Sequence, residues 1–186
     1  MRFLLALFII IGLASCNNDV VIKPKAQLRL DYTKAIYNDF VNNCNYSFQK
    51  NERAIPQKKR NCGFNLHYPK MKATLYITYQ EVKESNIDSL LRDAQKLAYD
   101  HAIKAESIPE QPFVNTDKNV FGMFYMINGN AATQAEFYVT DSIRHFVTGA
   151  LYFEAKPNFD SIYPAVVYLR NDIRKIMETL EWETKD

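Results

Sequence analysis

The side chains best suited to acid–base or metal chemistry are three histidines, His67, His101 and His145. They lie far apart in the sequence and form no H-x-H, H-E-x-x-H or EF-hand pattern, so only tertiary contacts would assemble a metal site. We expect His67 to be exposed on a strand and His101 to be packed and hydrogen-bonded beside a helix. We expect His145 to lie at the rim of a sheet. The sequence therefore predicts no metal site and no cofactor.

Motifs of the common enzyme classes are missing as well. The sequence contains no G-x-S-x-G elbow, no P-loop and no G-x-G-x-x-G turn. A serine or carboxylate site is still compatible with the chain, because such groups are brought together in space rather than in sequence. A hydrolase would ordinarily leave one local signature, so the sequence favours a noncatalytic protein and keeps an enzyme as the minor alternative.

A third kind of chemistry, lipid attachment, is indicated at Cys16, which ends the segment MRFLLALFIIIGLASC. Arg2 precedes an apolar run over 3–13 that matches a secretory signal and is too short to span about 30 Å of hydrocarbon. The ending Leu-Ala-Ser-Cys is a lipobox. We therefore predict a signal peptide over 1–15 and a Cys16 that carries acyl chains as a membrane anchor. The alternatives are an ordinary secretory signal with a chance cysteine, or a buried N-terminal helix.

The remaining cysteines, Cys44 and Cys62, form an even pair in a chain that is expected to be exported. Disulfides persist in oxidising compartments, so a bridge is predicted, and it would stabilise the fold by about 3 kcal/mol in the chain-entropy model. Two free thiols are the alternative. Neither cysteine lies in a C-x-x-C motif or beside a histidine, so a redox role is not expected.

Composition indicates one well-packed domain without affinity for nucleic acid. The 186 residues include twelve Tyr and twelve Phe but five Gly, and the formal net charge is only +2. Aromatic residues favour strands, and a nearly neutral chain creates no general attraction for an acidic polymer. We assign the lipidated cysteine and a tether to 16–25, and a single domain to 26–186.

Alternation of apolar and polar residues predicts most of the strands. Expected strands cover 28–32, 44–49, 62–79 with a break at Pro69, 120–127, 136–140 and 144–153. Other expectations are a helical turn within 33–43, a charged loop over 50–61, an irregular or edge segment at 109–112, and turns at 128–130 and 141–142.

Two amphipathic helices complete the predicted fold. One begins at Ser85 or Asn86 and runs to about Lys104, and the other begins at Asp160 or Ser161, with Pro164 in its first turn. We expect both helices to cover one face of an antiparallel sheet. The fold class is therefore α+β, an antiparallel meander packed with two main amphipathic helices.

Two basic segments are candidate contact surfaces. Lys58, Lys59 and Arg60 form a run that is usually a solvated loop, with lipid headgroups or an acidic partner as the alternative. The polar face of the final helix carries a further set of cations, Arg170, Arg174 and Lys175, within a mixed-charge pattern that is usually solvated.

Long motifs resemble a known family, the gliding motility lipoprotein GldD. They are NLHYPKMKATLYITY, IDSLLRDAQKLAYDHAIKA, VFGMFYMINGNAATQAEFYVTDS and RHFVTGALYFEAKPNFDSIYPAVVYLRNDIRKIMETLEW. The resemblance covers almost all of the chain after Cys16, and the two other cysteines fall where the family carries its pair. The pattern of GFNLHYP, HFVTGALYF and the closing helix is also faintly similar to the PsbP/Mog1-like sandwich, which bears on architecture alone.

The resemblance implies a lipid-anchored envelope component of gliding bacteria that is needed for gliding and for type IX protein secretion. Its implied partners are other gliding and secretion envelope proteins, and it would face the periplasm, with the choice between inner and outer membrane left open. No catalytic residues are known for the family, so none are carried over. We expect a noncatalytic accessory protein that assembles or stabilises envelope subunits. The alternative is a ligand- or glycan-binding lipoprotein that uses its many tyrosines.

Overall fold

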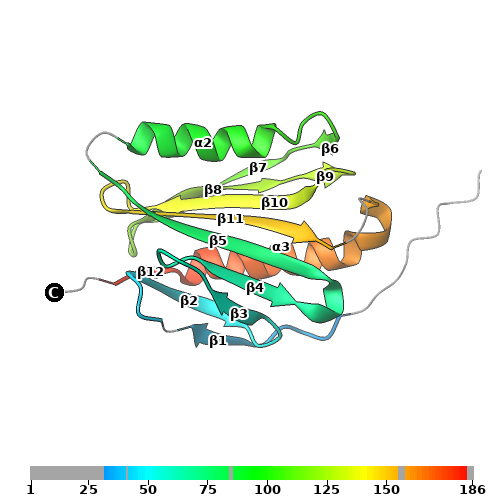
Figure 1. Ribbon diagram of the computed structural model, residues 1–186, viewed down its shortest axis with the longest axis horizontal. Coiled ribbons are helices and arrows are strands. Elements are labelled where there is room, and N and C mark those ends of the chain that lie inside the picture. Colours follow the sequence, from blue (N-terminus) through cyan, green and yellow to red (C-terminus); the bar gives the residue numbers. More distant parts are fainter. Residues whose placement is uncertain (1–31, 41, 84–85, 155–157, 184–186) are drawn as a thin grey trace, which may run out of the picture.

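The computed structural model describes residues 32–40, 42–83, 86–154 and 158–183. They form three sheets, two α-helices and a 3-10 turn (Figure 1). The large sheet has the strand order β3 (Ile55–Lys58), β4 (Phe64–Tyr68), β5 (Ala73–Glu81), β11 (His145–Phe153), β10 (Thr133–Thr140), β8 (Val120–Met126), β7 (Glu110–Asn115). The small sheets are β1 (Tyr37–Phe40), β2 (Tyr46–Asn51), β12 (Glu181–Trp182), and β6 (Ala105–Ser107), β9 (Asn128–Gly129). The helices are η1 (Pro69–Met71), α2 (Ile87–Tyr99) and α3 (Phe159–Thr179).

The large sheet lies between α2 on one face and α3 with the β1-β2-β12 sheet on the other. Strand side chains alternate between faces, so Tyr138 and Phe146 pack with Leu90 of α2, whereas their neighbours Phe137 and Val147 join the main core on the α3 side. All pairings within the large sheet are antiparallel. The chain leaves β5, passes through α2 and returns at β7, so α2 makes the long connection (Figure 1).

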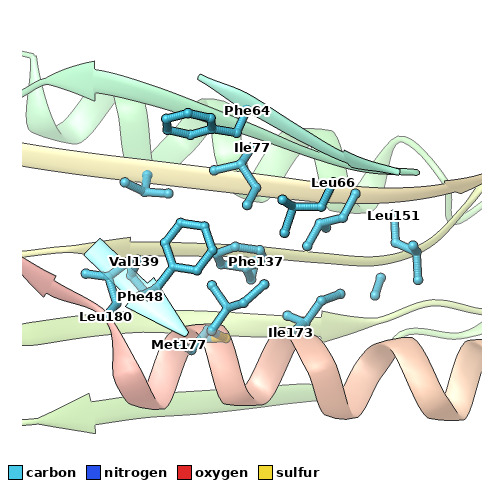
Figure 2. Packing of buried hydrophobic residues seen from close by; sticks show 14 of the residues in the cluster. Phe48, Phe64, Leu66, Ile77, Phe137, Val139, Leu151, Ile173, Met177 and Leu180 are labelled. Atoms are coloured by element: carbon cyan, nitrogen blue, oxygen red, sulfur yellow. The ribbon is translucent and has the colours of Figure 1, made fainter. Parts of the chain in front are cut away.

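The main core fills the space between the large sheet and α3. Figure 2 shows Ile173 and Met177 of α3 directed at the strands, where Phe137 and Val139 belong to the same cluster. Gly149 on β11 makes room for the ring of Phe137, because a Cβ at this position would lie 2.1 Å from Cε1 of that ring. Phe137 and Gly149 are register partners across β10 and β11, so the ring occupies the space that a side chain at position 149 would fill.

Several expectations about the elements are confirmed. The fold class is α+β, and the strands at 44–49, 62–79, 120–127, 136–140 and 144–153 are present with small shifts at their ends. The strand over 62–79 is interrupted at Pro69 by η1, because proline cannot donate to a sheet ladder. Pro112 lies in β7, at one edge of the large sheet. The expected strand at 28–32 falls almost wholly outside the described residues.

Other expectations about local structure are wrong. The segment 33–43 holds β1 rather than a helical turn, the charged loop 50–61 contains the edge strand β3, and Asn128–Gly129 pairs as β9 with β6. The final helix is capped by Asn158, whose Oδ1 accepts the Ser161 N–H, so Pro164 lies inside the helix rather than in its first turn. In the three strand cases a pairing with another strand overrides the local pattern, whereas at the helix the cap lies at Asn158, earlier in the chain than expected.

We expected both helices to cover the same face of the sheet, but they pack on opposite faces. Their apolar stripes are compatible with either side, because the strands carry apolar residues on both faces, such as Phe137 and Tyr138 on β10. The side on which each helix packs is decided by the whole sheet. The faint similarity to the PsbP/Mog1-like sandwich stays a prediction.

Candidate functional site

The three histidines lie in three different environments. His67 Nδ1 is 3.0 Å from Thr74 Oγ1, and its side chain is half-buried rather than exposed. His101 follows the end of α2, and its Nε2 lies 3.3 Å from Glu136 Oε1. Within the described residues, no group of three or more His, Cys, Asp or Glu side chains is arranged to hold a metal ion.

His145 is buried rather than placed at an open rim. Its Nδ1 is 2.9 Å from the Tyr79 hydroxyl, and its ring stacks on Trp182 with centroids 5.1 Å apart. Burial lowers the pKa of the imidazole, so the neutral ring is favoured at neutral pH. Trp182 in turn donates its indole N–H to the Asn119 carbonyl. This group of contacts fixes the C-terminal strand β12 against the large sheet and explains the position of His145 without catalysis.

Cys44 and Cys62 form a disulfide with a Cα–Cα distance of 5.6 Å. It joins the segment before β2 to the turn between β3 and β4, so it ties the small sheet to the edge of the large one. The Tyr46 hydroxyl donates to the Cys62 carbonyl beside the bridge. The predicted disulfide is therefore present, and its role is to connect two sheets.

The basic run lies in the turn that precedes Cys62. Lys58, Lys59 and Arg60 are all exposed, and Asn61 and Cys62 adopt positive φ values that tighten the turn. A hollow of about 480 Å³ adjoins this turn and includes Lys83 from the end of β5. The turn thus presents a small cationic surface at one corner of the molecule.

The cations of α3 do not form one solvated face. Arg170 is 7% exposed, and its guanidinium donates to the carbonyls of Ile127 and Gln134 at 3.0 and 2.9 Å. Arg174 lies over the ring of Phe124 at 5.1 Å. The expectation of a mixed-charge solvated face is therefore wrong at Arg170, because the interior carbonyls at β9 and β10 need a donor.

Two further α3 positions complete this correction. Asp172 is 1% exposed and accepts hydrogen bonds from the Tyr37 hydroxyl at 2.7 Å and from Asn51 Nδ2 at 2.8 Å. Burial raises the pKa of Asp172, and these hydrogen bonds lower it in part. Lys175 lies 5.8 Å from the centre of the Tyr37 ring. These contacts attach β1 and β2 to α3.

The open part of the α2-side sheet face was missed by the sequence analysis. Here Tyr76 of β5 and Tyr152 of β11 pack edge to face with centroids 5.7 Å apart. A hollow of about 360 Å³ adjoins them, with Thr74, Phe153 and Glu154 as its other lining residues. The signal for this site is the alternation Thr74-Leu75-Tyr76, but only the strand register shows that Tyr152 comes beside it.

Cys16 lies outside the described residues, as do the whole of the predicted tether and signal peptide. In the part of the chain that the structure describes, neither helix is long and apolar enough to cross a membrane. A comparison with protein families matches residues 17–182 to the family described as gliding motility lipoprotein GldD. The chain belongs to the GldD family. A search of curated proteins finds no match.

Membership of the GldD family carries three statements about the protein. It is a lipoprotein related to gliding motility, it belongs to the cell envelope with a membrane anchor, and it associates with a motility apparatus. The match spans all three sheets, α2 and α3, so the whole described fold is characteristic of the family rather than an addition to it.

Proposed function

We propose that this GldD-family protein is a noncatalytic accessory component of the gliding motility and type IX secretion apparatus. It assembles or stabilises other envelope subunits while it is held at a membrane. The observation that carries the proposal is the family match over residues 17–182, which begins directly after the lipobox cysteine Cys16. The three histidines lie apart from one another and contact Thr74, Glu136 and Tyr79 in turn. This arrangement supports a role without catalysis.

We also propose the division of the chain that the sequence predicts. Residues 1–15 are the signal peptide, 16–25 contain the lipidated cysteine and tether, and 26–186 form one domain that faces the periplasm. Acyl chains on Cys16 hold the mature protein at a membrane, since each buried CH₂ contributes about 0.8 kcal/mol. The folded part then acts within reach of that membrane.

The surface proposed for contact with other subunits is the basic turn, Lys58, Lys59 and Arg60. All three side chains are exposed, and the turn is braced by the Cys44–Cys62 disulfide. A cationic surface of this kind favours an acidic partner and speeds its association. On α3, Arg174 and Lys175 are half-buried; Arg174 lies over Phe124 of β8, toward the opposite edge of the large sheet from the turn, so these two cations form a separate candidate contact.

The anchor is tested by Cys16→Ala in cells, with Ser15→Ala as the matched control. The control keeps a small residue before the cysteine, so lipidation continues. We expect the Cys16→Ala protein to leave the membrane fraction and gliding to be strongly impaired, whereas Ser15→Ala behaves as wild type. Normal gliding by cells in which the Cys16→Ala protein has left the membrane contradicts the tether.

The accessory role is tested by crosslinking in cells, followed by recovery of tagged protein and mass spectrometry. We expect motility or secretion subunits in stoichiometric amount. The triple change of Lys58, Lys59 and Arg60 to Ala should reduce that recovery, and Arg92→Ala, at an exposed position on α2, should leave it unchanged. Recovery of the lipoprotein alone from wild-type cells would contradict the accessory role.

A further inference from the structure

The face of the large sheet that carries α2 is only partly covered. Helix α2 packs on Tyr138 and Phe146, on the side of β10, and Figure 1 shows it lying away from β3 and β4. No described helix or second sheet covers this face of β4, β5 and part of β11, although Asn65 and Thr74 on it are only 8% and 6% exposed. An open sheet face in a protein of this size normally carries charged side chains, since these are the residues that most favour water.

The open strands carry a different set of side chains. Register places Asn65, Tyr76 and Ala150 in one row across β4, β5 and β11, and His67, Thr74 and Tyr152 in the next row. None of these six is a lysine, arginine, aspartate or glutamate. Tyr76 is 44% exposed, so a large aromatic ring faces solvent amid small and uncharged polar groups.

These two rows of side chains end at a hollow that is lined by both aromatic and polar side chains. It has a volume of about 360 Å³ and is lined by Thr74, Tyr76, Tyr152, Phe153 and Glu154. His67 lies beside it, with Nδ1 3.8 Å from Glu154 Oε1. The hollow thus combines aromatic rings with a hydroxyl and a carboxylate, with an imidazole beside it, and its volume falls in the range of about 300–1,000 Å³ that is usual for small-ligand sites.

We infer that this hollow and the open face around Tyr76 and Tyr152 bind an oligosaccharide. A sugar ring has an apolar C–H face that packs on an aromatic ring, and hydroxyls at its edge that hydrogen-bond to neutral polar groups and carboxylates. Tyr76 offers the ring, Glu154 offers a carboxylate in the hollow, and beside the hollow His67, whose Nδ1 contacts Thr74 Oγ1, has a second ring nitrogen that can donate or accept. Ala150, next to Tyr76 in the register, leaves space in front of the sheet.

Other ligand classes fit this site less well. Among the described residues, no lysine or arginine lines the hollow, so this lining offers none of the cations that a phosphate or nucleic acid requires. A purely apolar ligand would leave the groups at the rim without hydrogen bonds, which is costly when they are desolvated. A protein partner would need about 800 Å² on this side for a stable interface, whereas the aromatic pair is confined to one concave spot.

Binding is tested by isothermal titration of full-length protein purified from membranes. The detergent is a polyoxyethylene ether, because maltoside and glucoside detergents are themselves sugars. The probes are triacetylchitotriose, cellotriose and maltotriose, which separate a preference for N-acetylated amino sugars, such as those of cell-wall strands, from one for plain hexose chains. We expect at least one probe to bind with a Kd below about 1 mM.

The site is assigned by variants of Tyr76. Tyr76→Ala should weaken binding at least tenfold, and Tyr76→Phe should retain most of it because the ring remains. The matched control is Tyr163→Ala, which removes a tyrosine of similar exposure, 42%, on α3. Equal thermal unfolding midpoints of the two alanine variants show that the loss is not caused by misfolding.

Three results overturn the inference. One is the absence of binding by all three trisaccharides to the wild-type protein. The second is equal weakening by Tyr76→Ala and Tyr163→Ala. The third is a Tyr76→Ala protein that keeps its sugar affinity but loses a crosslinked envelope protein, which would make this face a protein-docking surface. The first two readouts are independent of whether the anchor and the accessory role hold, and the third uses the crosslinking that tests the accessory role.

Discussion

Glu136 and His101 meet beneath the end of α2, where Nε2 of the histidine lies 3.3 Å from Oε1 of the carboxylate. Glu136 is 3% exposed, and neither of its oxygens has a well-aligned hydrogen bond. Burial is the main cause that raises the pKa of Glu136 to about 7, and burial also lowers the pKa of His101. The short distance suits an ion pair, but desolvation opposes both charges, so at pH 7 we assign a neutral imidazole to His101 and place Glu136 near the midpoint of its titration.

This pair predicts a pH dependence that Glu136→Gln removes. The folded state binds more protons at Glu136 than the unfolded state between about pH 4.5 and pH 7, so this residue makes the free energy of unfolding fall as pH rises through that window. The loss is at most about 3 kcal/mol. Relative to Glu136→Gln, wild type should therefore lose stability from pH 4.5 to 7 and then stay level. Parallel curves from urea unfolding at each pH would exclude the buried neutral carboxyl.

A second prediction concerns the disulfide. Replacing Cys44 and Cys62 together with Ala removes the covalent link between the small sheet and the large one. The disulfide joins two residues with a sequence separation of 18. The chain-entropy model gives a loss of about 3 kcal/mol in the free energy of unfolding. Urea unfolding of the variant measures it, and wild type reduced with dithiothreitol should show a similar loss. A variant as stable as oxidised wild type would contradict a structural role for the bridge.

A third prediction concerns the glycine beneath Phe137. Gly149→Ala adds a Cβ that would lie 2.1 Å from the Phe137 ring, so the ring or the strand must move, and the expected loss is about 1–3 kcal/mol. Phe137→Leu replaces the ring with a smaller, branched side chain. The double variant should lose clearly less stability than the sum of the two single losses, because the added methyl then has room. Additive losses in denaturant unfolding would argue against a direct clash.

A fourth prediction separates structural from surface cations. Arg170→Ala leaves the buried carbonyls of Ile127 and Gln134 without their donor, and the expected loss is about 2–4 kcal/mol. Arg92→Ala, at an exposed position on α2, should change stability by less than about 0.5 kcal/mol. Denaturant unfolding and the cellular protein level measure the effect. Equal stability of the two variants, with motility lost only for Arg170→Ala, would instead indicate a contact with a partner.

The sequence by itself determined the periodic elements. Leu75 and Ile77 alternate with Tyr76, and Leu169, Ile173 and Ile176 recur at helical spacing, because each pattern reflects the geometry of a single strand or helix. The α+β class follows from these elements, and the family could be predicted from the long motifs. The lipobox at Cys16 rests on the sequence alone, and lipidation there stays a prediction.

Only the tertiary structure decided what each element packs against. Arg170 and Asp172 look like surface residues in the sequence, yet both are buried, because Ile127, Gln134, Tyr37 and Asn51 reach them from distant strands. The strand β3 forms within the charged segment 50–61 because β4 offers it a partner. The pairing of β5 with β11 brings Tyr76 to Tyr152 across a long stretch of chain. Local periodicity fixes which side chains share a face, whereas long-range pairing decides which faces meet.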